Sequence, residues 1–257
     1  MLRFPAARLA RQVAFYDGVV GESGLGAGGG WATERLCRGL SIRGAEGIPE
    51  EGPVLVVSNH PGLADSLSLF VALARSGRGE DLRVVVEERE FLRALPNTSQ
   101  YLIPASDPGG RPAGVGSLRA ASRHLGSGGA LLVFPKGRIE PDPASMPGAE
   151  DSLGDWGPSL DLFARLAPEA PVIPAIVSGV ISPAALASPV TRLRRRPEDS
   201  RWLAASLQML VPALRDVHTE VSFGRPVYRG NDKSVAGVRE EILSQARRMI
   251  RSARASC

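Results

Sequence analysis

The chain has few of the residues that build metal centres and disulfide frameworks. It contains only two cysteines and three histidines among 257 residues. Cys37 and Cys257 lie far apart and outside any Cys-x-x-Cys spacing. They therefore form neither a disulfide framework nor a zinc site, and their scarcity indicates a reducing compartment. With only three histidines in the chain, we expect no multi-histidine metal centre and no metal.

Long hydrophobic runs are also missing. The longest uncharged run, residues 170–191, is interrupted by Pro171, Pro174, Pro183 and Pro189. A membrane-spanning helix needs about 20 mostly apolar residues, so this run predicts a buried strand followed by a loop. The N-terminus lacks the unbroken apolar core of a signal peptide. Its apolar residues instead fall at helical spacing, which fits either a helix on a bilayer surface or one packed on the protein's own core.

Charge is unevenly distributed along the chain. The formal net charge is +4, and the basic residues are two lysines and 29 arginines. From Leu186 to the end there are 14 basic and 7 acidic residues, while the rest of the chain carries a net charge of −3. Such a basic tail fits an anionic partner (a membrane surface, a phosphorylated cofactor or nucleic acid) and equally a solvated face. Because interleaved aromatics and a known nucleic-acid module are lacking, we expect no nucleic-acid partner.

Strand and helix patterns alternate from residue 49 onward. Short apolar runs predict strands at 53–58, 83–86, 130–134, 172–177 and 220–223, and helical spacing predicts helices at 65–74, 117–125, 159–166, 201–214 and 238–253. This alternation is typical of an α/β fold with a mostly parallel, mixed sheet flanked by helices. We divide the chain into an N-terminal helical segment with a flexible Gly-rich joint at 24–30 (residues 1–45), a central domain (46–230) and a basic C-terminal helix (231–257).

A histidine and an aspartate follow the first strand of the central domain, in the stretch SNHPGLAD (58–65). Ligands of such sheets bind beyond the carboxyl ends of the strands, which is where this stretch lies. Four residues separate His60 from Asp65, enough for the carboxylate to fold back toward the imidazole. A carboxylate that accepts from one ring nitrogen fixes the tautomer and lets the other nitrogen act as a base near neutral pH. Alternatively, the pair only holds the turn together.

Two cations follow the strand at 130–134, in the stretch FPKGRIE (134–140). Lys136 and Arg138 flank Gly137 at the expected mouth of the sheet. A lysine offers a point charge and an arginine a two-pronged fork for phosphate oxygens, so this stretch predicts an anion-binding loop. The alternative is an ordinary basic turn on the surface.

Together these stretches resemble the glycerolipid acyltransferases of the PlsC, or lysophosphatidic acid acyltransferase, type. SNHPGLADS (58–66) is similar to the family's first block, Asn-His, four residues, then Asp, and FPKGR (134–138) is similar to its third block. VIPAI (172–176) is similar to the fourth block, and EVSFGRPV (220–227) to the strand that often closes the domain. The similarity extends over residues 47–227. It implies that residues 46–230 form an acyltransferase domain with the glycerolipid acyltransferase fold.

The resemblance implies transfer of a fatty acyl group from acyl-CoA or acyl carrier protein to a hydroxyl of a lysophosphatidic acid or glycerophosphate-like acceptor in phospholipid biosynthesis. His60 would take the proton of the acceptor hydroxyl, and Asp65 would orient the ring. The residues expected to bind substrate are Asn59, Arg111, Lys136, Gly137, Arg138 and Glu140. The family uses neither metal nor prosthetic group and docks on the inner face of the cell membrane. We therefore expect a cytoplasmic, peripheral enzyme with no cofactor besides its acyl donor.

Two departures from the family pattern concern the acceptor. The arginine of the second block is missing from the matching stretch, residues 101–107, and Arg111 is the nearest one. In the third block Lys136 replaces the usual glutamate and Arg138 comes one residue early, with Glu140 as a candidate substitute for the lost acid. These changes motivate an alternative function, a non-catalytic lipid-binding protein on an acyltransferase fold. A serine hydrolase is disfavoured, because Ser58 and Ser66 lie outside any Gly-x-Ser-x-Gly elbow.

Overall fold

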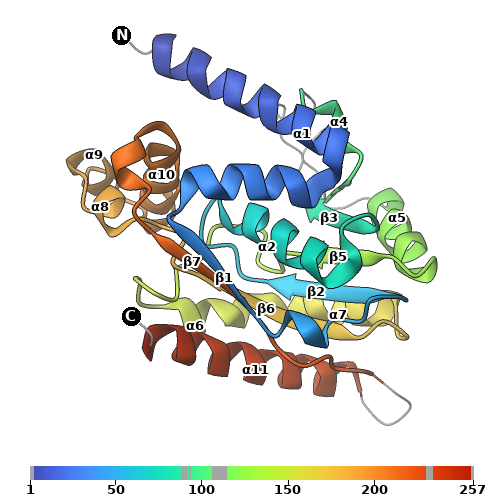
Figure 1. The fold of residues 1–257 in the computed structure, drawn as a ribbon. Helices are drawn as coiled ribbons and strands as arrows, with labels where there is room; N and C mark the ends of the chain where they lie inside the picture. The colour runs from blue at the N-terminus through green and yellow to red at the C-terminus, as the bar shows by residue number, and fades with distance from the viewer. Residues whose placement is uncertain (1–2, 88–91, 93, 106–114, 230–233, 256–257) are drawn as a thin grey trace.

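A seven-stranded sheet forms the centre of the molecule (Figure 1). The computed structural model describes residues 3–87, 92, 94–105, 115–229 and 234–255. The strands lie side by side in the order β1-β7-β6-β2-β5-β3-β4. Their bounds are β1 Gly39–Arg43, β2 Val54–Ser58, β3 Leu82–Val86, β4 Leu102–Pro104, β5 Ala130–Val133, β6 Val172–Ser178 and β7 His218–Phe223.

Helices cover both faces of this sheet. The α-helices are α1 Arg3–Leu36, α2 Asp65–Leu73, α4 Pro96–Ser99, α5 Val115–Gly126, α6 Ala149–Ser152, α7 Gly157–Leu166, α8 Pro183–Leu186, α9 Pro189–Arg192, α10 Pro197–Leu210 and α11 Val235–Ala255. Short helical turns of other types are η1 Ala45–Gly47, η2 Ala74–Arg78, η3 Leu153–Trp156 and η4 Pro212–Leu214. In Figure 1, α1 and α2 lie above the sheet, and α6, α7 and α11 lie below it.

The direction of the strands determines where a ligand site forms. Strands β6, β2, β5, β3 and β4 run parallel to one another. Strand β7 pairs antiparallel with β6, and β1 pairs parallel with β7. The predicted fold, a mostly parallel mixed sheet flanked by helices with an N-terminal helix, is confirmed. The carboxyl ends of the five parallel strands therefore share one edge of the sheet, where ligands of such folds bind.

Alternation along β2 builds a separate core on each face. Val54 and Val56 belong to the core under α1 and α2, whereas Leu55 and Val57 belong to the core over α7 and α11. All five residues of the strand are buried, as expected for the middle of a parallel sheet covered on both sides. A continuous apolar run was therefore the correct signal for this strand.

Two strands were not predicted, and both lie at the edges of the sheet. Strand β1, with the sequence GLSIR, is only partly buried and carries no continuous apolar run. Strand β4 has only three residues and includes a proline. Proteins often protect the edge of a sheet from further pairing with short, partly polar strands. Such strands carry no clear apolar pattern in the sequence. Strand β1 also lies within residues 1–45, the segment predicted to precede the central domain.

The glycines at 24–30 form part of helix α1, so the flexible joint predicted there is wrong. Helix α1 bends at Gly24, whose φ of 82° is accessible mainly to glycine, and its second half packs on α2. A Cβ atom on Gly26 would lie 2.2 Å from the Cβ of Ala74, and one on Gly29 would lie 2.6 Å from the carbonyl oxygen of Leu67. The glycines therefore serve close contact between helices rather than flexibility.

Helices α8, α9 and α10 form a separate group at the left of Figure 1, beyond the carboxyl end of β2. Helix α11 packs under β6, and its arginines pair with acidic residues of the fold: Arg239 with Asp161, and Arg251 with Glu150.

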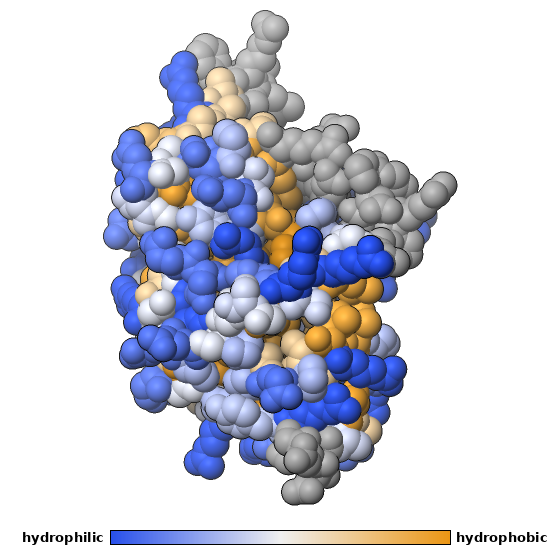
Figure 2. All heavy atoms as spheres, turned by 90° about the vertical axis from the view of Figure 1, so that its right-hand side faces the viewer, coloured by the Kyte–Doolittle hydropathy of each residue, from blue (hydrophilic) through white to orange (hydrophobic). Residues whose placement is uncertain are grey.

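The face shown in Figure 2 is mostly hydrophilic, with a band of hydrophobic side chains along its middle. None of the described helices combines the length and hydropathy needed to cross a bilayer.

Candidate active site

The carboxyl ends of three neighbouring strands bring the predicted blocks together. Strand β2 lies between β5 and β6, so the stretches that follow β2 and β5 meet at one edge of the sheet. The backbone N–H of Glu140 donates to the carbonyl oxygen of His60 over 2.8 Å. The rings of His60 and Phe134 pack with their centroids 4.8 Å apart. The first and third blocks are therefore in direct contact.

His60 and Asp65 form a hydrogen-bonded pair, with 2.6 Å between Nδ1 of His60 and Oδ2 of Asp65. The turn between β2 and α2 also holds the carboxylate, since the backbone N–H groups of Gly62 and Ser66 donate to it over 3.4 and 2.7 Å. Asp65 lies in the first turn of α2, where the helix dipole favours a negative charge. The carboxylate is fully buried, whereas the His60 side chain is 25% exposed.

This anchoring of Nδ1 determines what Nε2 can do. An ionised carboxylate only accepts hydrogen bonds, so Nδ1 carries the proton and Nε2 of the neutral ring keeps its lone pair. Burial lowers the pKa of His60, but the charge and hydrogen bond of Asp65 and the charge of Glu140 raise it more, so the pKa lies above its ordinary value. The arrangement suits a general base that accepts a proton at Nε2.

Glu140 differs from its predicted role in substrate binding, because no part of it is exposed. Its Oε2 accepts the backbone N–H of His60 over 3.0 Å. Its Oε1 accepts the hydroxyl of Ser152 over 2.7 Å and the indole N–H of Trp156 over 3.0 Å. Burial raises the pKa of Glu140, although these three donors partly offset the effect. Glu140 thus fixes the backbone of His60 by accepting its N–H, and its carboxylate does not reach the surface where a substrate would lie.

Asn59 also differs from its predicted role, since it is 2% exposed and both ends of its amide are used by the protein. Its Nδ2 donates to the carbonyl oxygen of Val177 over 2.8 Å, and its Oδ1 accepts the N–H of Val177 over 2.7 Å. Val177 belongs to β6, the strand beside β2. Asn59 therefore continues the pairing of the two strands beyond the end of β2 and sets the direction in which the chain leaves toward His60.

The predicted anion-binding loop follows β5 directly. Gly137 adopts a φ of 67°, so the turn needs a residue without a Cβ at this point. Lys136 pairs with Asp155 over 3.2 Å, and Arg138, whose side chain is 68% exposed, lies 3.7 Å from Glu198 of α10. Arg111 lies outside the described residues. In this loop Lys136 is therefore closely paired with Asp155, whereas Arg138 is loosely paired with Glu198 and open to solvent.

Asp142 is a residue of this edge that sequence reasoning missed. It is fully buried, and its carboxylate accepts backbone N–H groups from Gly179, Val180 and Ile181 over 2.6 to 2.9 Å. It thereby ties the loop after Arg138 to the chain that leaves β6. The signal available in the sequence was its place in Glu-Pro-Asp-Pro just after the third block.

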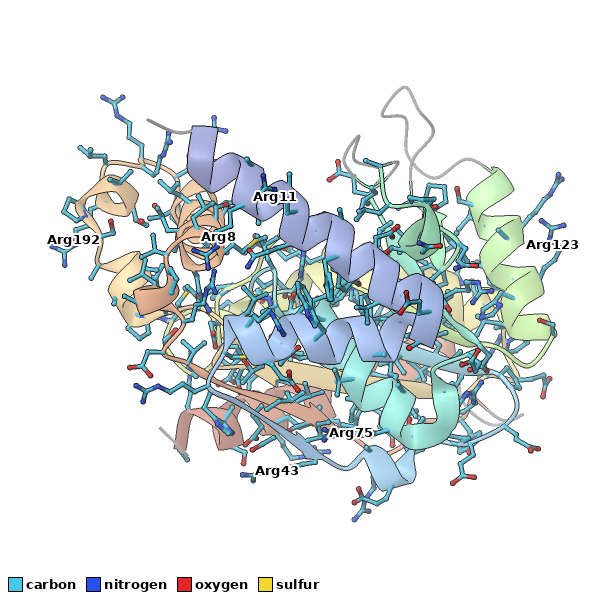
Figure 3. All side chains as sticks on the ribbon, turned by 45° about the horizontal axis from the view of Figure 1, so that its top comes forward. Arg8, Arg11, Arg43, Arg75, Arg123 and Arg192 are labelled. Atoms are coloured by element: carbon cyan, nitrogen blue, oxygen red, sulfur yellow. The ribbon has the colours of Figure 1, made fainter. Side chains whose placement is uncertain are left out.

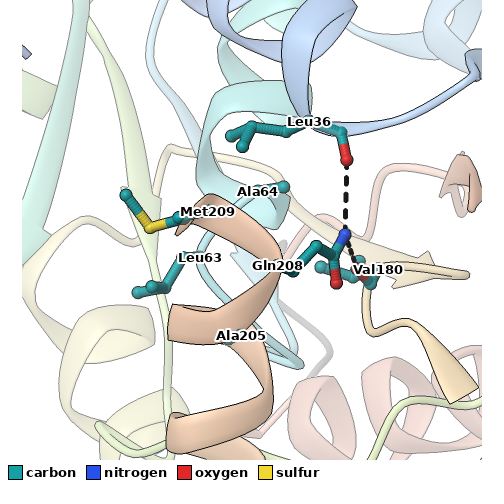
Figure 4. Close-up of a pocket in the computed structure, with 7 residues that line it drawn as sticks. All are labelled: Leu36, Leu63, Ala64, Val180, Ala205, Gln208 and Met209. Atoms are coloured by element: carbon teal, nitrogen blue, oxygen red, sulfur yellow. Dashed lines mark hydrogen bonds between the residues drawn. The ribbon is translucent and has the colours of Figure 1, made fainter. Parts of the chain in front are cut away.

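Helix α10 lies against the turn that joins His60 to Asp65. Figure 4 shows Leu63 and Ala64 of the turn beside Ala205, Gln208 and Met209 of α10, which together line a small cavity. Gln208 is buried and donates to the carbonyl oxygens of Val180 and Leu36 over 3.0 and 3.3 Å. Helix α10 therefore packs against the turn that carries the His60–Asp65 pair, which the sequence did not indicate.

Among the described residues, no group of three or more histidine, cysteine, aspartate or glutamate side chains is arranged to hold a metal ion. Ser58 and Ser66 donate to Asn59 and Asp65 respectively. The imidazole of His60 is hydrogen-bonded to Asp65, and its Nε2 atom is the one placed to accept a proton.

Three comparisons with known proteins bear on the family of the chain. No curated protein matches the chain. Among solved structures it is similar to the crystal structure of the 1-acyl-sn-glycerophosphate (LPA) acyltransferase PlsC from Thermotoga maritima, with 16% sequence identity and a TM-score of 0.49 over 87% of this chain and 76% of that one. The family model described as Acyltransferase matches residues 39–178, from β1 to the end of β6. This match spans more than half of the sequence and includes both blocks described above, so the chain belongs to the acyltransferase family.

Proposed function

We propose that the protein transfers a fatty acyl group from acyl-CoA or acyl carrier protein to a hydroxyl of a lysophosphatidic acid or glycerophosphate-like acceptor, in phospholipid biosynthesis. The observation that carries this proposal is the 2.6 Å contact between His60 Nδ1 and Asp65 Oδ2 at the open edge of the sheet. The contact leaves Nε2 as a base, and the imidazole is partly open to solvent.

The reaction needs one proton to move twice. Nε2 of His60 takes the proton of the acceptor hydroxyl while its oxygen attacks the thioester carbonyl carbon, and Asp65 stabilises the imidazolium. The tetrahedral intermediate then collapses, the carbon–sulfur bond breaks, and the imidazolium returns the proton to the departing thiolate. An ester and a free thiol result, and no metal or prosthetic group takes part. Glu140 holds His60 in position by accepting its backbone N–H, and Asn59, the preceding residue, is fixed to Val177 of β6.

We also propose that the enzyme docks peripherally on an anionic membrane surface, at the inner face of the cell membrane, through the outer side of α9 and α10. Helices α9 and α10 and the residues that directly follow them expose the apolar side chains of Val190, Leu193, Trp202, Leu210 and Val211, with Leu193 81% and Trp202 52% exposed. Arginines at 192 and 194–196 lie among them, and Figure 3 shows Arg192 pointing away from the fold. Exposed apolar groups beside arginines fit an anionic lipid surface.

Vesicle sedimentation tests this surface. Leu193→Glu should weaken binding to phosphatidylglycerol vesicles, while Tyr228→Glu, at a residue that is 57% exposed elsewhere, should leave it unchanged. Equal binding of the wild type and Leu193→Glu would exclude this docking mode.

Product analysis tests the reaction. The wild-type protein is incubated with acyl-CoA or acyl carrier protein and a panel of lysophospholipids and glycerol phosphate, and esters and free thiol are measured by mass spectrometry. We expect a new ester and one thiol per ester. Lipid binding without any ester, across the whole panel, would instead support the non-catalytic lipid-binding alternative.

A further inference from the structure

One arginine of α10 has a buried nitrogen atom without a hydrogen-bond partner in the described part of the chain. Arg201 of α10 is partly buried, and its Nε atom is shielded from solvent without any hydrogen-bond partner. Leaving a buried donor of a charged group unsatisfied destabilises the fold, so such groups are rare and call for an explanation. A ligand that supplies the missing acceptor is one.

The helix places Arg201 on the side that faces the site. Ala205 and Gln208 of α10 line the cavity against Leu63 and Ala64, the residues between His60 and Asp65. Arg201 precedes Ala205 by four residues, and residues four apart lie on the same face of a helix. Arg201 therefore continues the inner face of α10, one turn closer to the helix N-terminus. The carboxylates whose charges act on its guanidinium are Glu198 and Glu140, and Glu140 is bonded to His60.

A second guanidinium reaches the same place from the third block. Nη1 of Arg138 lies 3.7 Å from Oε1 of Glu198, which precedes Arg201 by three residues on α10. The carboxylate of Glu198 thus interacts with both guanidinium groups, by a 3.7 Å contact with Arg138 and through its charge with Arg201. Glu198 is itself 47% exposed and holds Arg138 only at long range, so its side chain is free to turn toward solvent.

The other cation of the third block is less available. Lys136 is only 12% exposed and pairs with Asp155 over 3.2 Å, and it also acts on the buried Glu140. The pair formed by Arg138 and Arg201 is better suited to a doubly charged group, because each guanidinium offers two parallel N–H donors.

We propose that Arg138 and Arg201 together bind a phosphate group of a substrate beside His60, replacing Glu198 as the partner of Arg138. This inference rests on the proposed acyl transfer and names Arg201 of α10, outside the matched region of the family model, as a substrate-binding residue. The phosphate is either that of the lysophosphatidate acceptor or one of those of coenzyme A.

Matched substrates with and without phosphate distinguish these sources. Arg201→Ala should raise KM for the substrate whose phosphate is bound, lysophosphatidate or acyl-CoA, roughly 10- to 100-fold, the range expected when a charge-assisted hydrogen bond is lost, with kcat changed far less. If the acceptor phosphate is bound, KM for monoacylglycerol stays unchanged. If a coenzyme A phosphate is bound, KM rises for acyl-CoA and not for acyl-pantetheine. Arg201→Lys should recover part of the effect, since it keeps the charge but not the fork.

The control is Arg123→Ala, because Arg123 is exposed on α5 and points away from the fold in Figure 3. Thermal melting of each variant shows that it is folded. Unchanged KM values for both phosphorylated substrates in folded Arg201→Ala would overturn the proposal. Calorimetric binding of lysophosphatidate and of coenzyme A to the wild type and Arg201→Ala gives a readout that does not depend on turnover. If the wild type forms no ester, the proposed function fails, while equal binding by both proteins would overturn the role of Arg201.

Discussion

Replacing Asp65 by asparagine should disable His60 through its tautomer. The two oxygens of Asp65 serve two sides: Oδ2 faces Nδ1 of His60 and accepts only a long bond, 3.4 Å, from the N–H of Gly62, whereas Oδ1 accepts the backbone N–H of Ser66 over 2.7 Å. An asparagine has one oxygen for these two sides. With its oxygen toward His60, its NH₂ group would face the N–H of Ser66, donor against donor. With its oxygen toward Ser66, its NH₂ donates to Nδ1, and the ring proton moves to Nε2.

The difference between these two orientations sets the size of the effect. A buried N–H without an acceptor costs about 1–3 kcal/mol, so the second orientation dominates by roughly 5- to 150-fold. In that orientation Nε2 carries a proton and is unable to accept one. The carboxylate that stabilises the imidazolium is lost as well. We expect kcat to fall by roughly 10²- to 10⁴-fold, the upper value being that of the same replacement in a Ser-His-Asp triad.

The assay is the pH dependence of the initial rate of ester formation. Neutral His60 is the active form, so the rate rises as pH increases through the pKa of His60, which lies above its ordinary value of about 6.5 in the wild type. Asp65→Asn removes the charge that raises this pKa and leaves the burial that lowers it. The acidic limb of the profile should therefore move to lower pH. A rate within threefold of the wild type, or an acidic limb that stays in place, would refute this reasoning.

Two further predictions concern the support of the site. In Glu140→Gln the amide oxygen can still accept from Ser152 and Trp156, but the NH₂ group then faces the N–H of His60. We therefore expect the free energy of unfolding to fall by about 1–3 kcal/mol and kcat to fall as well. Urea unfolding measures the first effect and initial rates measure the second. Unchanged stability and rate would mean that Glu140 does not hold His60. Gly29→Ala should destabilise the protein by roughly 1–3 kcal/mol, because the new Cβ would lie 2.6 Å from a backbone oxygen of α2. Gly18→Ala, in the same helix with nothing within 4 Å, should instead stabilise it by up to about 1 kcal/mol; equal melting temperatures for the two variants would contradict the packing of α1 on α2.

The central strands and the His60–Asp65 pair were predictable because their signals are local. A buried parallel strand such as β2 has a continuous apolar run, and the turn after it fixes the spacing of a histidine and an aspartate within eight residues, 58–65. The third block was predictable for the same reason, since it follows β5 directly.

The roles of individual side chains were less predictable, because burial and long-range contacts decide them. Asn59 precedes the predicted base in sequence, but its amide is hydrogen-bonded to Val177, far along the chain. Glu140 lies beside the base in space, but its Oε1 accepts hydrogen bonds from Ser152 and Trp156. The glycines of α1 looked like a joint because composition alone does not tell a flexible segment from a helix that needs close packing. The contribution of α10 depends on its docking against the turn after β2, which no local pattern encodes.

The role of His60 as the base is tested most directly by the rate of ester formation by His60→Ala beside His218→Ala. His218 is an exposed histidine bonded to Ser41, so its loss controls for a change of one imidazole elsewhere in the chain. We expect kcat of folded His60→Ala to fall by at least about 10²-fold, as for removal of a general base, and that of His218→Ala to stay near the wild type. Wild-type kcat in folded His60→Ala would contradict the proposal that Nε2 of His60 takes the proton of the acceptor.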